Sequence, residues 1–174
     1  MKTKILTINQ YLLSRLDIIV YFLSYIVPIA ITHPQWITGT IVNCFLYISA
    51  EKLNKKEYYP ILILPSLGAI TRGLLFGPQT IFLYYFLPFI WLGNYLLVFV
   101  FSTTKNSNYL LRISLASFLK YLLLITTASL YFKLKIVPQI FVTSMGIMQL
   151  ITAFTGGLLA IIIIQILNKN YERT

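Results

Sequence analysis

The stretch LPSLGAITRGLLFGPQTIFLYYFLPFIWLGN (residues 64–94) decides the fold. It is apolar enough to lie in lipid, yet helix breakers and polar groups recur along it, including Pro65, Arg72, Pro88 and Asn94. Kinked backbone persists at membrane depth only where protein or a wet cavity satisfies the freed N–H and C=O groups. An arginine inside a span marks a candidate functional site. The stretch therefore predicts two consecutive spans that line an internal site, which the other spans enclose.

Composition places the whole chain in a membrane. Of its 174 residues, 58% are hydrophobic and 10% are charged, whereas soluble domains carry about 25% charged residues. The apolar runs are continuous, and they lack the alternation of apolar and polar residues that marks a membrane β-barrel. The sequence predicts an all-α integral membrane bundle of six transmembrane helices, formed by residues 1–174 as a single transmembrane domain.

Apolar runs and turn signals divide this domain. Residues 1–17 mix apolar and basic positions and predict an interfacial N-terminal segment without a cleaved signal peptide. Gly77-Pro78 and the polar loops at 51–57 and 102–108 separate the later runs. The predicted spans are 18–32, 36–50, 58–76, 79–102, 109–132 and 140–167.

Positive charges fix the orientation of these spans. Six spans with a cytoplasmic N-terminus place most of the 14 Lys and Arg residues on the cytoplasmic side. These are Lys2, Lys4, Arg15, Lys52, Lys55, Lys56, Lys105, Arg112, Lys169 and Arg173. The sequence therefore predicts a multi-pass protein of the cell (inner or plasma) membrane with both termini in the cytoplasm.

Several polar residues fall at membrane depth and form the candidate ligand-binding set: Arg72, Lys120, Asn43, Asn94 and Gln149. The four acidic residues all fall at the cytoplasmic face in this topology, so none reaches Arg72 or Lys120. An anionic or carbonyl-rich ligand would satisfy these two cations. The competing interpretation is structural, with Arg72 reaching lipid phosphate and the asparagines joining helices by hydrogen bonds.

The sequence lacks the residue combinations that most other membrane-protein functions require. There are no paired carboxylates, no cluster of metal ligands and no Ser–His combination in the spans, so we expect no catalytic residue, no metal site and no cofactor. The single Cys44 cannot hold an iron–sulfur cluster. The basic residues are spread out, which argues against nucleic acid as a partner. An ion-coupled pump usually has an acidic residue inside the membrane, and the predicted spans contain none.

The small size, basic charge and six predicted spans resemble the substrate-binding S components of energy-coupling-factor (ECF) transporters. The resemblance implies a ligand in the outer half of the bundle, a coupling membrane subunit and ATPases. The segments ITGTIVNCFLYISA (37–50), LPSLGAITRGLL (64–75) and LPFIWLGNYLLV (87–98) are also similar to a group of small six-span bacterial membrane proteins of unassigned function.

Two functions follow as expectations. The first is an S-component-like transport subunit that binds a small, anionic molecule and is energised by separate subunits. The alternative is a non-transporting assembly partner or lipid-binding scaffold of a larger membrane complex, in which the polar residues only join helices.

Overall fold

The computed structural model describes residues 15–31, 33–73 and 77–172, and these residues form helices joined by short turns, with no strand among them. The predicted all-α fold is confirmed, and each of the six predicted spans contains helix. The elements are α2 (Leu16–Ala30), α3 (Gln35–Lys52), α4 (Tyr59–Arg72), the 3₁₀-helix η1 (Gly77–Phe82), α5 (Leu83–Thr103), α6 (Tyr109–Lys133), α7 (Ile140–Met145) and α8 (Ile147–Glu172). The predicted interfacial segment 1–17 lies almost entirely outside the described residues.

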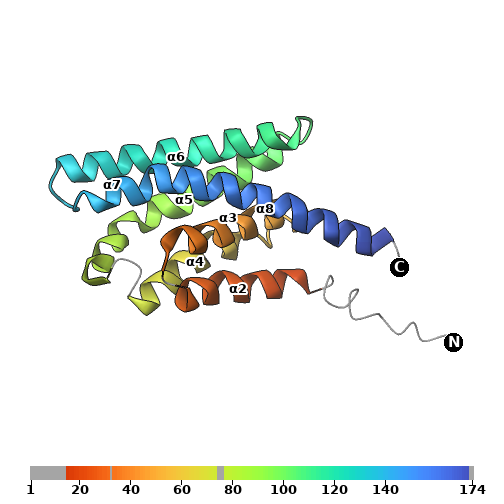
Figure 1. Ribbon diagram of the computed structural model, residues 1–174, viewed down its shortest axis with the longest axis horizontal. Coiled ribbons are helices and arrows are strands. Elements are labelled where there is room, and N and C mark those ends of the chain that lie inside the picture. Colours follow the sequence, from red (N-terminus) through yellow and green to blue (C-terminus); the bar gives the residue numbers. More distant parts are fainter. Residues whose placement is uncertain (1–14, 32, 74–76, 173–174) are drawn as a thin grey trace.

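The long helices run alternately in opposite directions along one axis (Figure 1). Arg15, the 53–58 turn, the 104–108 turn and the C-terminal end of α8 consequently lie at one end of the bundle, called here the basic end. The 134–139 turn and the C-terminal end of α4 lie at the other end, called here the cavity end. This arrangement places Arg15, Lys52, Lys55, Lys56 and Lys105 at the basic end, and Lys133 and Lys135 at the cavity end.

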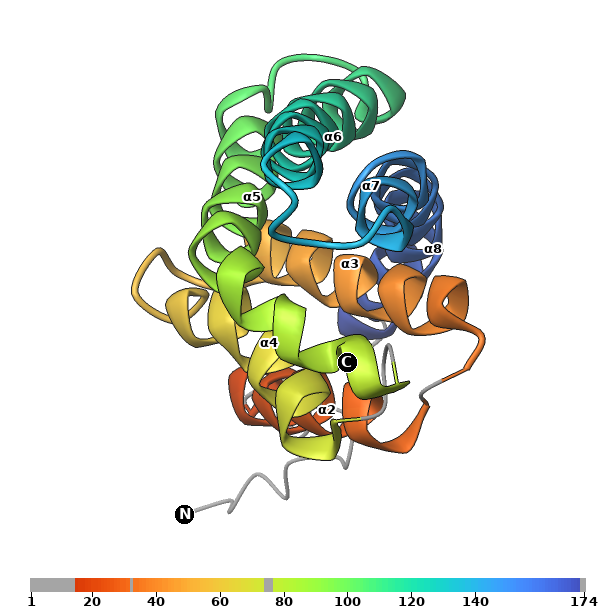
Figure 2. The ribbon, with the colours of Figure 1, turned by 90° about the vertical axis from the view of Figure 1, so that its left-hand side faces the viewer.

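Helix α3 lies at the centre of the bundle, where it contacts α2, α4, α5 and α8 (Figure 2). Its C-terminal half is almost completely enclosed, with Cys44, Leu46 and Tyr47 all buried. Helices α2, α4, α5, α6 and α8 surround it, and neighbours in this order contact each other. A central helix without a lipid-facing stripe explains why its sequence shows little amphipathic periodicity.

Two buried apolar clusters fill the bundle. The larger one surrounds the C-terminal half of α3 toward the basic end, and it includes Leu97 of α5 and Ile113 of α6. The smaller one lies toward the cavity end and includes Phe86 of α5 and Leu124 of α6. Between these clusters, three buried residues are polar: Asn94 on α5, and Ser117 and Lys120 on α6. They form a polar layer between the two apolar cores.

Helix α4 ends earlier than the sequence predicts. The third span was predicted to reach residue 76, but the helix stops at Arg72. Gly73 follows with φ +67°, the left-handed conformation that glycine adopts without a steric penalty, and its N–H donates to the Ala69 carbonyl. Arg72 therefore lies in the last turn of α4, where its side chain is exposed.

The last predicted span is interrupted. Residues 140–167 were predicted as one helix, but the chain leaves the helical conformation at Gly146, which has φ −96° and ψ −112°. The short α7 precedes this break and α8 follows it. The break directs Met145 and Met148, on its two sides, toward the interior.

Three helical segments, Thr80–Thr103, Tyr109–Lys133 and Ile140–Asn168, are long and apolar enough to cross a membrane. Helices α2 and α4 are shorter, with 15 and 14 residues. They pack closely against each other at one side of the bundle, and Gly68 of α4 touches the backbone of Tyr25.

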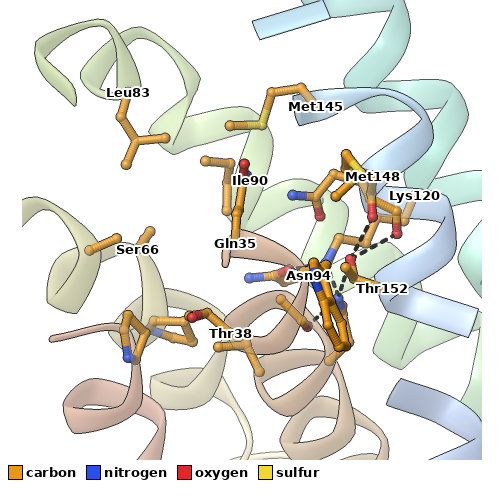
Figure 3. A pocket seen from close by; sticks show the side chains of 18 residues that line it. Gln35, Thr38, Ser66, Leu83, Ile90, Asn94, Lys120, Met145, Met148 and Thr152 are labelled. Atoms are coloured by element: carbon orange, nitrogen blue, oxygen red, sulfur yellow. Dashed lines mark hydrogen bonds between the residues drawn. The ribbon is translucent and has the colours of Figure 1, made fainter. Parts of the chain in front are cut away.

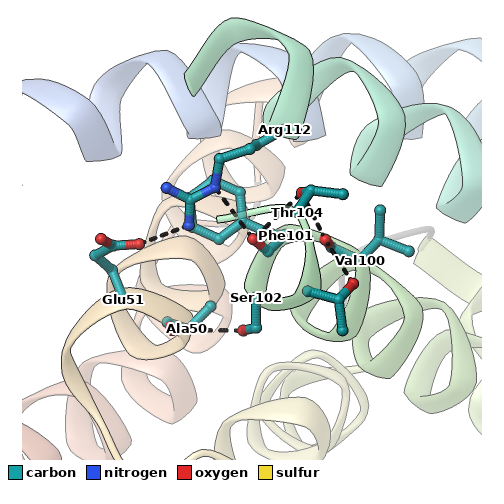
Figure 4. A network of polar contacts seen from close by, with 8 residues as sticks. Ala50, Glu51, Val100, Phe101, Ser102, Thr104 and Arg112 are labelled. Atoms are coloured by element: carbon teal, nitrogen blue, oxygen red, sulfur yellow. Dashed lines mark hydrogen bonds and ion pairs between the residues drawn. The ribbon is translucent and has the colours of Figure 1, made fainter. Parts of the chain in front are cut away.

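A charged pair at the basic end joins three helices (Figure 4). The buried Arg112 of α6 donates from Nη2 to the Glu51 carboxylate of α3 over 2.8 Å, and from Nε to the Phe101 carbonyl of α5 over 3.2 Å. Its guanidinium carbon also lies 3.9 Å from the centre of the Phe101 ring. The sequence predicted Arg112 only as one of the cytoplasmic charges, and this contact was not predicted.

Replacing Arg112 with lysine is expected to lower the free energy of unfolding by about 2 kcal/mol, because lysine keeps the charge but cannot make both contacts of the planar guanidinium. Denaturation of the purified protein with SDS, followed by circular dichroism, measures this loss. The control is Lys105→Ala, which alters an exposed residue in the adjacent turn. Equal stability of Arg112→Lys and the wild type would contradict the prediction.

Candidate functional site

The polar layer between the two apolar clusters is centred on Lys120 of α6. This side chain is only 2% exposed, and its ammonium donates to Oδ1 of Asn43 over 2.7 Å and to Oδ1 of Asn94 over 2.8 Å. The two asparagines come from α3 and α5 and are as deeply buried as the lysine. Lysine and asparagine residues far apart in the sequence thus meet in one buried cluster.

The amide orientations of both asparagines follow from their other contacts. Asn94 donates from Nδ2 to the Leu62 carbonyl of α4 over 2.8 Å. Asn43 donates from Nδ2 to the Gly39 carbonyl over 2.8 Å and to Oγ1 of Thr152 over 3.3 Å. With both NH₂ groups used in this way, both carbonyl oxygens face Lys120, as an ammonium requires.

These contacts connect five helices, because Thr152 belongs to α8 and itself donates to the Met148 carbonyl over 2.8 Å. An ammonium carries three N–H donors. Among the described residues, Lys120 uses two of them on neutral amide oxygens and forms no ion pair. Its positive charge is therefore hydrogen-bonded but not neutralised by the protein.

A cavity of about 100 Å³ adjoins this cluster (Figure 3). It reaches from Lys120 toward the cavity end of the bundle, and α2, α3, α4, α5, α6, α7 and α8 each contribute to its wall. The wall is formed by Pro28, Gln35, Trp36, Thr38, Gly39, Val42, Asn43, Pro65, Ser66, Ala69, Leu83, Ile90, Asn94, Lys120, Met145, Met148, Gln149 and Thr152.

The wall has a polar and an apolar part. Gln35 stands in the first turn of α3, and Gln149 stands in the first turn of α8. Both side chains line the cavity and are partly buried, and within the described chain their amides have no protein partner. Leu83, Ile90 and Met145 form apolar wall. The cavity thus offers polar groups and an apolar surface to the same molecule.

Four of the five candidate site residues meet here. Asn43, Asn94, Lys120 and Gln149 all line the cavity. Arg72 does not, because the early end of α4 leaves its side chain exposed at the cavity end. The predicted contribution of residues 64–94 to an internal wall agrees with the positions of Pro65, Ser66, Ala69, Leu83, Ile90 and Asn94.

The sequence analysis missed several wall residues. Thr152 follows Gln149 by three positions, so both lie on one face of α8, and this spacing was a usable signal. Gln35 and Trp36 open α3 but were not selected as candidate site residues. Trp91 donates from Nε1 to Oγ of Ser66 over 2.8 Å and thereby orients another wall residue.

The described residues contain no group of three or more His, Cys, Asp or Glu side chains that could hold a metal ion. The cavity can act through hydrogen bonds, the charge of Lys120 and apolar contact. No family model, curated protein or solved structure matches this chain, so its function is argued from the site itself.

Proposed function

We propose that this chain is a six-span membrane protein that binds a small molecule and serves as the substrate-binding subunit of a transporter. The observation that carries the proposal is a buried lysine, held by two asparagines, in the wall of a cavity between the helices. Polar and ionisable residues inside a membrane bundle are costly and are typical of substrate pathways.

The membrane assignment rests on helices and charges together. Three helical segments have the length and composition of spans, and α2, α3 and α4 lie alongside them in alternating directions (Figure 1). Among the described residues, the basic end holds most of the Lys and Arg, so the positive-inside rule places it in the cytoplasm. In this orientation the cavity end faces outward, and the protein is a multi-pass component of the cell membrane.

A binding subunit fits better than an autonomous pump. The described acids Asp17, Glu51 and Glu57 all lie at the basic end, and Glu51 is already paired with Arg112. No carboxylate is therefore available beside the cavity in the described residues to carry a coupling proton or sodium ion. A coupling membrane subunit with ATPases would supply the energy, as the resemblance to ECF S components implies.

Mild-detergent purification of the tagged chain from its own cells tests this function, with mass spectrometry of the associated proteins and small molecules. We expect ATPase subunits, a coupling membrane protein and a stoichiometric metabolite in the wild type. The metabolite should fall by about 10-fold in Lys120→Met, since loss of one charge-assisted hydrogen bond costs at least that much affinity. The associated proteins should remain unchanged in that variant.

The second candidate is a scaffold for a larger membrane complex. It is favoured by the hydrogen bonds of Lys120 and its neighbours, which join five helices and have a structural use without any ligand. Recovery of lipid only, or of an unrelated membrane complex, with no difference between wild type and Lys120→Met, would support this scaffold and contradict the transport subunit.

A further inference from the structure

We propose that the cavity beside Lys120 binds a short-chain monocarboxylate, with the carboxylate at Lys120 and the carbon chain against the apolar wall. This inference deepens the proposed function and rests on it, because it names the class of molecule that the same site takes. Charge, hydrogen-bonding capacity, apolar surface and volume each support it.

The charge of Lys120 favours an anionic ligand. Lys120 is 2% exposed and its protein partners are neutral amides, while Glu51 is paired with Arg112 at the basic end. A buried ion is costly unless a partner of opposite charge or water compensates it. A ligand with one negative charge would neutralise this lysine, whereas a cation would be repelled.

The hydrogen-bonding groups around the cavity favour the same charge. Lys120 retains one N–H beyond those that Asn43 and Asn94 accept. Gln35 and Gln149 add amide N–H donors at the first turns of α3 and α8. Neither first turn contains an acid, so the partial positive charge of each helix N-terminus is left uncompensated by acidic side chains.

The remaining wall limits the ligand in size and polarity. Leu83, Ile90, Met145 and Met148 line the cavity (Figure 3), and methionine adapts its shape to a bound apolar group. An apolar cavity of about 150 Å³ holds benzene, which has six non-hydrogen atoms, so the cavity of about 100 Å³ limits the ligand to roughly four to six such atoms. A carboxylate with a carbon chain as short as that of butyrate satisfies both limits.

Binding can be measured with the protein's own fluorescence, because Trp36 lines the cavity. Full-length protein in nanodiscs of neutral lipid is titrated with sodium butyrate, and separately with butyramide, which is nearly the same size but uncharged. We expect a saturable change for butyrate and at least about 10-fold weaker binding of butyramide, from the lost charge-assisted hydrogen bond. Trp36→Phe should abolish the signal and identify its source.

Asn43→Asp is the decisive variant. It keeps the shape of the side chain but places a carboxylate within reach of Lys120, where Asn43 now supplies a neutral oxygen at 2.7 Å. This internal counter-ion should weaken butyrate binding by about 10-fold or more and weaken butyramide binding less, so that the ratio of butyrate to butyramide affinity falls. Size-exclusion chromatography confirms that the variant is folded. If it is not, the butyrate-to-butyramide ratio of the wild type decides alone.

The outcomes separate this inference from the proposed function. Equal binding of butyrate and butyramide, or unchanged butyrate binding by Asn43→Asp, would overturn the carboxylate assignment but leave a binding subunit for a neutral molecule. A response to nanodiscs of anionic phosphatidylglycerol, with none to butyrate, would assign the charge to a lipid headgroup and also overturn it. Failure of the proposed function would appear separately, as the absence of transport subunits and of any metabolite after purification.

Discussion

Replacing Gly156 with alanine is expected to lower the free energy of unfolding by about 3 kcal/mol, one of the two largest effects we predict for this protein. A Cβ atom at this position would lie 2.7 Å from the Thr40 carbonyl oxygen and 2.9 Å from the Cys44 nitrogen. Both atoms belong to the backbone of α3 and cannot rotate away, so α8 would have to shift from the central helix. SDS denaturation followed by circular dichroism measures the change.

Gly93→Ala is the matched control. A Cβ atom at Gly93 would lie 3.4 Å from Cγ of Lys120, an ordinary contact with a flexible side chain. We expect this variant to remain within about 1 kcal/mol of the wild type. Similar losses in both variants would show that the small surface of Gly156 is not what holds α8 against α3.

Replacing Lys120 with methionine is expected to cost about 3 kcal/mol. Methionine has a similar length, so the volume is preserved, but the carbonyl oxygens of Asn43 and Asn94 lose their buried donor. Each unsatisfied buried group costs about 1–3 kcal/mol. The same SDS denaturation measures this loss.

A triple variant, Lys120→Met with Asn43→Leu and Asn94→Leu, tests whether the unsatisfied asparagine oxygens cause this loss of stability. Removing all partners of a buried polar cluster together is often neutral, while removing one is destabilising. We therefore expect the triple variant to recover most of the stability lost in Lys120→Met, although it should no longer distinguish butyrate from butyramide. If Lys120→Met were as stable as the wild type, the hydrogen bonds of Lys120 would not be what holds the helices together.

The helices could be located from the sequence because apolar runs end at charges, glycines and prolines. Helices α3 and α6 lie within two residues of their predicted bounds, since Lys52 and Lys133 stand at the ends of apolar segments. The end of α4 and the break at Gly146 were not predicted, because a glycine in an apolar run is equally compatible with close packing in a helix. Gly156 and Gly157, by contrast, lie within α8, where they pack closely against α3 and α6.

The candidate site, like the helices, could be predicted in part from the sequence. Polar residues in the middle of apolar helices have to face the interior, and this rule was enough to select Asn43, Asn94, Lys120 and Gln149 as neighbours. Arg72 does not line this cavity, because its position depends on where α4 ends. The pairing of Arg112 with Glu51 depended on the contact between α3 and the other two helices, which no local pattern encodes. The ligand-binding role of the selected residues stays a prediction.

The unequal helix lengths have a consequence for the surrounding bilayer. Helices α2 and α4 span only about 22 and 21 Å at 1.5 Å per residue, whereas the hydrocarbon core is about 30 Å thick. Helix α6, with 25 residues, is longer than that core. In the proposed orientation this hydrophobic mismatch thins the lipid on one flank and draws headgroups and water inward beside α2 and α4. Lipid acyl-chain length would thus alter the bilayer beside α2 and α4 more than beside α6.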